Sequence, residues 1–157
     1  MIAFISYSLN ESEKYVVTLL AQKLREKGFS LTSGFSQSPS FVDFQTENEI
    51  KNSSLFIGLV TSSGRNNFPK VYSELHKALT YNKPAILLVE DTVKLDSGLA
   101  NFPNLIRFNR YYPDIAMEEV KNRIQTSKTV QQDNSLAWIL GGAAALALIS
   151  YLSSEKK

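Results

Sequence analysis

Short apolar runs alternate with amphipathic segments over residues 1–125. The most apolar run, residues 55–61, has hardly a polar position, which is typical of a central parallel strand buried on both faces. The other runs are shorter, and glycine, proline, serine or asparagine residues lie next to them, as is common for strands. Strands are therefore predicted over residues 2–7, 29–32, 55–61, 85–89 and 105–108.

The segments between these runs have the apolar period of helices. Between the first two runs, Val16, Leu20 and Leu24 fall on one face, and Gly28 ends the segment. Strands and helices that alternate in this way close, through right-handed crossovers, into a flavodoxin-like open sheet of five parallel strands with helices on both faces. Helices are predicted over residues 10–27, 43–52, 68–82 and 114–125, the last capped by Asp114.

The C-terminal part of the chain has a different composition. Residues 126–134 are polar, which predicts a linker after the domain. Residues 136–152 carry no charge and as a helix would reach about 26 Å, close to the thickness of a bilayer core. Trp138 and Tyr151 lie near the two ends of this stretch, where aromatic side chains prefer the lipid headgroups. A transmembrane helix is therefore predicted over residues 135–154, and a C-terminal helix packed on the domain is the alternative.

Composition and charge exclude several classes of function. The sequence has 17 Lys and Arg against 15 Asp and Glu, and a net charge of +2 does not favour a nucleic-acid partner. It has no cysteine and one histidine, so disulfides, thiol nucleophiles and thiolate or histidine-paired metal sites are excluded, and no metal is expected. Neither Gly-x-Gly-x-x-Gly nor Gly-Lys-Ser/Thr occurs, which argues against ordinary dehydrogenases and NTPases.

Candidate site residues follow the apolar runs, because open parallel sheets bind ligands beyond the carboxyl ends of their strands. These positions are residues 6–8, 33–35, 61–64 and 90–91. They are rich in hydroxyl, aromatic and carboxylate side chains. The pattern offers polar contacts for a small molecule and does not name a reaction.

Several segments resemble the TIR (Toll/interleukin-1 receptor) domain family. Residues 4–8, Phe-Ile-Ser-Tyr-Ser, are similar to the first sequence box of the family. Residues 49–62, 72–79 and 84–89 are similar to its middle, with a helix, a central strand, a loop and a helix that carries an acidic residue. The resemblance covers residues 1–125 and implies the flavodoxin-like sheet of a TIR domain.

The resemblance implies that Glu74 is catalytic. In TIR domains that consume NAD, a glutamate early in the helix after the third strand has this role, and Glu74 is at the matching position. Cleavage of the nicotinamide–ribose bond builds positive charge on the ribose, which a nearby carboxylate stabilises. The alternative is an exposed helix glutamate that pairs with Lys70 or Lys77.

The resemblance also implies substrate-binding residues, whose alternative role is ordinary strand-end and loop packing. Many NAD-cleaving members have a tryptophan where this chain has Lys70 and an arginine where it has Ser8. Tyr72 and Arg65 are candidates to supply the missing aromatic ring and cation. The residues predicted to bind substrate are Ser6, Tyr7, Ser8, Gly34, Phe35 and Tyr72.

The resemblance favours a membrane-anchored NAD glycohydrolase, a signalling or antiviral defence effector of prokaryotes that self-assembles through its TIR domains. NAD would be a substrate and no cofactor would be needed. A single-pass anchor in the cell inner membrane would keep the domain in the cytoplasm, where NAD is found. The alternatives are a non-catalytic TIR adaptor that recruits other TIR domains, an enzyme that makes a cyclic ADP-ribose-type messenger, and a nucleoside deoxyribosyltransferase-like enzyme.

Overall fold

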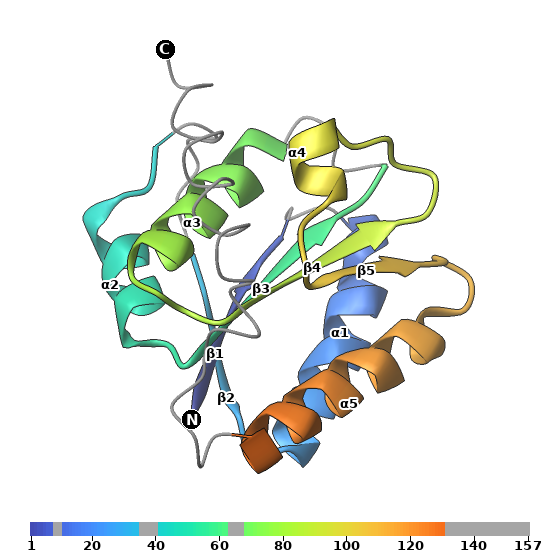
Figure 1. Ribbon diagram of the computed structural model, residues 1–157, viewed down its shortest axis with the longest axis horizontal. Coiled ribbons are helices and arrows are strands. Elements are labelled where there is room, and N and C mark those ends of the chain that lie inside the picture. The colour runs from blue at the N-terminus through green and yellow to red at the C-terminus, as the bar shows by residue number, and fades with distance from the viewer. Residues whose placement is uncertain (8–10, 35–40, 63–67, 131–157) are drawn as a thin grey trace.

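The computed structural model describes residues 1–7, 11–34, 41–62 and 68–130, and its centre is a five-stranded parallel sheet (Figure 1). The strand order in the sheet is β2-β1-β3-β4-β5, and all neighbouring strands run parallel. The predicted α/β fold with an open five-stranded parallel sheet is confirmed. The elements are β1 (Ile2–Ser6), α1 (Glu11–Glu26), β2 (Ser30–Ser33), α2 (Phe44–Asn52), β3 (Leu55–Val60), α3 (Phe68–Thr80), β4 (Ala85–Glu90), α4 (Ser97–Ala100), β5 (Leu105–Phe108) and α5 (Pro113–Val130).

Two elements differ from the prediction by more than two residues. α4 lies in the connection between β4 and β5, where no helix is predicted, because its four residues are too few to show a helical period. α5 begins at Pro113, a residue that suits the first position of a helix, and continues to Val130, beyond the predicted end at Gln125. The first residues of the predicted linker 126–134 are therefore helical.

The predicted transmembrane helix over residues 135–154 lies outside the described residues. Within the part of the chain that the structure describes, none of the helices is long and apolar enough to cross a bilayer.

Helices cover both faces of the sheet, with α1 and α5 on one face and α2, α3 and α4 on the other (Figure 1). Side chains alternate along each strand, so Ile5 and Ile57 pack toward α1 and α5, whereas Phe4 and Phe56 pack toward α2 and α3. The rings of Phe4 and Phe56 stack with their centroids 5.7 Å apart. This stacked pair is part of the core on the face of the sheet that carries α2 and α3.

Gly58 allows α3 to approach the middle of the sheet. A Cβ atom at this position would lie 2.9 Å from Leu87 Cδ1 and 3.0 Å from Val71 Cγ1, which is closer than side chains normally pack. Gly58 pairs in register with Ser6 at the end of β1. The two strands that meet here, β1 and β3, form the switch point of the 2-1-3-4-5 order, where ligands of such sheets bind.

Candidate active site

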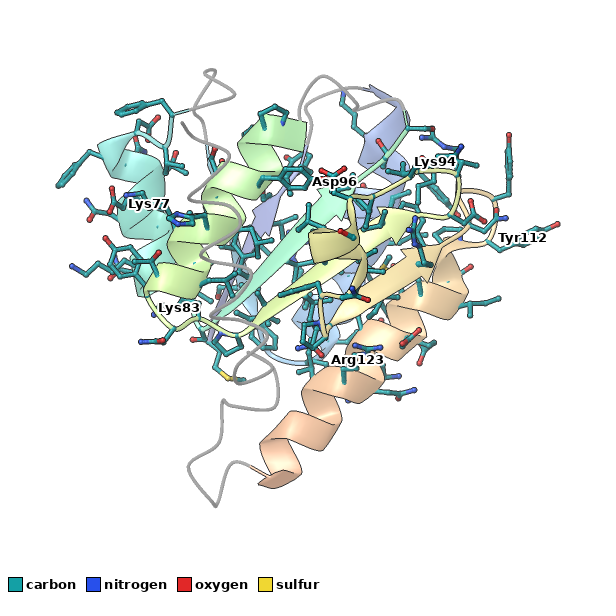
Figure 2. The ribbon with its side chains drawn as sticks, turned by 45° about the horizontal axis from the view of Figure 1, so that its top comes forward. Lys77, Lys83, Lys94, Asp96, Tyr112 and Arg123 are labelled. Carbon is teal, nitrogen blue, oxygen red and sulfur yellow. The ribbon has the colours of Figure 1, made fainter. Side chains whose placement is uncertain are left out.

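The side chain of Glu74 is buried on the sheet side of α3. The residue is 1% exposed, and neither carboxylate oxygen has a hydrogen-bond partner among the described residues. The alternative of an exposed glutamate paired with lysine is therefore wrong. Lys77 lies on the side of α3 that faces α2, and its Nζ is 3.3 Å from Glu47 Oε1 (Figure 2). Lys70 donates from Nζ to the backbone carbonyl of Tyr7, at 3.2 Å.

Gly34 brings the end of β2 against this carboxylate. A Cβ atom built at Gly34 would lie 2.9 Å from Glu74 Oε1 and 2.7 Å from Thr46 Cγ2. The Thr46 hydroxyl oxygen would be 3.1 Å from the same point. Only a residue without a side chain lets the chain pass between α2 and α3 here, so Gly34 brings Glu74 and Thr46 together.

Two buried hydroxyl groups next to Glu74 also have no hydrogen-bond partner in the described part of the chain. Within the described residues, neither Ser6 Oγ nor Thr46 Oγ1 forms a hydrogen bond. Two threonines in other helices, Thr18 and Thr80, donate to the carbonyl four residues earlier, at 2.7 and 2.8 Å. Buried polar groups are seldom left unpaired without a function, so these hydroxyls and the carboxylate form a polar cluster suited to a ligand.

The charge state of Glu74 is set mainly by its burial. Burial raises the pKa of its carboxyl group, and the nearby Asp43 adds to this rise. The Ser6 hydroxyl and the Lys70 ammonium group oppose it, although neither meets hydrogen-bond geometry with Glu74. Asp43 itself caps α2 by accepting from the backbone N–H of Thr46 at 2.7 Å, and this hydrogen bond lowers its pKa.

A second buried carboxylate, that of Glu90, lies at the carboxyl end of β4 and has several hydrogen-bond partners. It accepts from the backbone N–H of Ser62 at 2.8 Å and from two guanidinium nitrogens of Arg110, each at 3.0 Å. Arg110 is the main cause of the lowered pKa of Glu90. Glu90 therefore ties the ends of β3, β4 and β5 together and offers little to a ligand.

The structure brings together three of the predicted site residues, Ser6, Gly34 and Glu74. Tyr7 contributes a backbone carbonyl to Lys70, while its side chain packs on the α1–α5 face, opposite to Glu74. Tyr72 packs against the apolar core under α2, α3 and α4. Ser8 and Phe35 lie outside the described residues.

Three site residues were not predicted from sequence: Asp43, Thr46 and Lys70. The spacing of four residues between Lys70 and Glu74 predicts that both lie on the same side of a helix, but the sequence alone indicates only an exposed ion pair. Thr46 has no comparable signal, since its place next to Glu74 depends on how α2 packs against Gly34. Among the described residues, no group of three histidine or acidic side chains could hold a metal ion.

No protein-family model and no curated protein matches the chain. Among solved structures, the fold is similar to that of the CMP N-glycosidase BcmB of Clostridium botulinum, with a TM-score of 0.53 and 22% sequence identity. The alignment covers 76% of this chain and 98% of the glycosidase chain. The two proteins therefore share a fold over nearly the whole of that enzyme.

Proposed function

We propose that this protein cleaves the N-glycosidic bond of a nucleotide, with Glu74 as the catalytic carboxylate and NAD as the substrate. The observation that carries the proposal is the buried carboxylate of Glu74, which has no partner among the described residues and lies at the switch point of the sheet. Burial of such a group is costly, and a cationic transition state would offset the cost when substrate binds.

The surrounding groups suit a ribose. As the bond between C1′ and the base nitrogen breaks, its electron pair stays on the nitrogen and positive charge develops on C1′ and the ring oxygen. The ionised carboxylate of Glu74 stabilises this charge, and the Ser6 and Thr46 hydroxyls are available to hydrogen-bond with the ribose hydroxyls. Water then supplies the oxygen that bonds to C1′ and releases a proton.

Nicotinamide is a suitable leaving group for a site whose described residues offer no second carboxyl group to donate a proton. Its ring nitrogen is positively charged in NAD, so nicotinamide leaves as a neutral molecule without a proton from the enzyme. Most other bases leave as anions unless an acid protonates them. Among the described residues, Asp43 is the other acid close enough to affect Glu74, and its lowered pKa means that it holds no proton at neutral pH.

The resemblance of residues 1–125 to TIR domains is a second reason, independent of this chemistry, to propose NAD as the substrate. A pyrimidine nucleotide is the second candidate substrate, and the shared fold with a CMP N-glycosidase favours it. A non-catalytic adaptor is less favoured, because a domain that only docks has no use for an unpartnered buried carboxylate.

The test is product analysis with the purified full-length protein in detergent. NAD, nicotinamide mononucleotide, CMP and AMP are incubated separately, and released bases and sugar products are identified by chromatography and mass spectrometry. We expect nicotinamide release from NAD, and the second product distinguishes hydrolysis from cyclisation. Glu74→Gln should lower the rate at least about 100-fold, whereas Glu119→Gln, on the exposed side of α5, serves as the matched control.

Two outcomes would contradict the proposal. One is wild-type protein that releases no base from any of these nucleotides. The other is a folded Glu74→Gln variant that cleaves NAD at the wild-type rate. Cleavage of CMP with NAD left intact would instead favour the second candidate substrate.

Membrane anchoring through residues 135–154 and self-assembly through the TIR-like domain are part of this proposal and rest on the sequence alone. If neighbouring molecules complete each other's sites, specific activity should rise with protein concentration. Specific activity that stays constant over a hundredfold dilution would indicate a complete site in each molecule.

A further inference from the structure

The ammonium group of Lys70 is buried, and among the described residues it has no anion in direct contact, although the carboxylate of Glu74 attracts it from a distance. Lys70 is 8% exposed, and the one hydrogen bond of its Nζ within the described residues goes to the neutral backbone carbonyl of Tyr7. No carboxylate of the described residues lies within ion-pair distance of it. An ammonium group has three donors, so two of them have no partner among the described residues. A buried cation in this state is costly unless an anion joins it.

A second positive feature coincides with Lys70. The residue lies in the first turn of α3, a helix of 13 residues whose first turn holds no acidic residue. The N-terminal turn of a helix carries partial positive charge and favours anions. The hydrogen bond to Tyr7 places this turn at the carboxyl end of β1, beside the switch point.

The distance between this turn and Glu74 fits one nucleotide. Lys70 and Glu74 are four residues apart on the same side of α3, which corresponds to about 6 Å along the helix axis. That separation is comparable to the distance within a nucleotide from C1′, where the glycosidic bond breaks, to the phosphorus of the 5′-phosphate. A substrate with C1′ at Glu74 would therefore place its phosphate near Lys70.

We propose that Lys70 and the N-terminal turn of α3 bind the 5′-phosphate of the substrate, so that the site selects nucleotides over nucleosides. This inference rests on the proposed function, and it assigns a role to Lys70 at the position where many NAD-cleaving TIR domains have a tryptophan. The ligand chemistry is a ribose 5-phosphate ester, which NAD, nicotinamide mononucleotide and CMP share.

The first experiment compares substrates that differ only in the phosphate, using the full-length protein in detergent. The pairs are nicotinamide mononucleotide with nicotinamide riboside, and CMP with cytidine, and kcat/KM is measured for each. We expect Lys70→Met to lower kcat/KM about 10- to 100-fold for the nucleotide, the range for one lost charge-assisted hydrogen bond. The nucleoside should change less than about threefold, and Lys70→Arg should restore part of the preference for the nucleotide.

Two further variants separate charge from structure. Lys70→Gln keeps a donor for the Tyr7 carbonyl and removes the charge, so it should lose the phosphate preference even if Lys70→Met folds poorly. Lys77→Met removes a lysine of the same helix that pairs with Glu47, and the preference should remain. A Lys70 variant that slows nucleotide and nucleoside equally would overturn the proposal and make Lys70 a structural or Glu74-directed residue.

The second experiment does not depend on turnover. Calorimetry measures the binding of ribose 5-phosphate and ribose to the Glu74→Gln protein, with and without Lys70→Met. We expect ribose 5-phosphate to bind at least about tenfold more tightly than ribose, and Lys70→Met to remove the difference. Equal binding of the two sugars would overturn the phosphate assignment even if NAD is cleaved. If no nucleotide is cleaved, the proposed function fails, and this measurement still decides the role of Lys70.

Discussion

Replacing Glu74 with glutamine should stabilise the protein at neutral pH. Burial raises the pKa of Glu74 above its ordinary value of 4.5, so the folded state holds this proton more tightly than the unfolded state does. Below about pH 4.5 the carboxyl group of Glu74 is protonated in both the folded and the unfolded state, so folding buries no charge. As the pH rises from there through the folded-state pKa, folding stability falls. Glutamine cannot ionise, so the Glu74→Gln variant escapes this loss.

The size of the effect follows from the surroundings of the carboxylate. A buried charged group without hydrogen bonds costs upward of about 1–3 kcal/mol. Two effects make the expected gain smaller than this cost. Attraction to Lys70 already reduces the cost of the buried charge, and the buried amide of glutamine would also lack partners among the described residues. We therefore expect a gain of about 1–2 kcal/mol at about pH 7.5, which corresponds to about 3–8 °C in Tm for a domain of this size.

Thermal unfolding followed by circular dichroism at about pH 7.5 and about pH 4 tests this expectation. The Tm of Glu74→Gln should exceed that of the wild type at the higher pH and match it within about 1 °C at the lower one. Glu119→Gln, which removes an exposed carboxylate bonded to Arg123, should change stability by less than about 0.5 kcal/mol. A Glu74→Gln protein less stable than the wild type at about pH 7.5 would refute the reasoning, as would a gain equal at both pH values.

Three further predictions concern the site, its support and the predicted anchor. Gly34→Ala would force a methyl group to within 2.9 Å of Glu74 Oε1. We therefore expect kcat/KM for NAD to fall at least about tenfold and the free energy of unfolding to fall by about 1–3 kcal/mol. Unchanged kinetics would disprove the contact. Glu90→Gln should act opposite to Glu74→Gln, because Arg110 lowers the pKa of Glu90 and stabilises the fold above about pH 4.5. In urea unfolding at neutral pH, the free energy of unfolding of Glu90→Gln should be about 3 kcal/mol lower than that of the wild type. This difference should shrink as the pH falls through the folded-state pKa of Glu90. Residues 1–134 expressed alone should fold and stay in the supernatant while the full chain pellets with membranes; an unfolded truncation would assign the C-terminal segment to the core.

The sheet could be predicted from sequence because each buried strand corresponds to a run of apolar residues. The contact between Gly34 and Glu74 could not be predicted, since it depends on how α2 and α3 pack on the sheet. The resemblance to TIR domains directed attention to Glu74, but a polar residue in an amphipathic helix gives no sign that it will be buried. Neighbouring residues of a strand point to opposite faces, so Ser6 and Tyr7 could not both have turned their side chains toward α3.

The site is assembled from the first half of the chain, which divides the molecule into a chemical part and a supporting part. β4, α4, β5 and α5 contribute no side chain to the cluster around Glu74. Every site residue is therefore synthesised before β4, the strand that pairs with β3 on the side away from β1. Substitutions in the supporting part should change how much protein is folded and leave the rate per folded molecule unaltered. The site residues made first are Ser6, Gly34, Asp43, Thr46, Lys70 and Glu74.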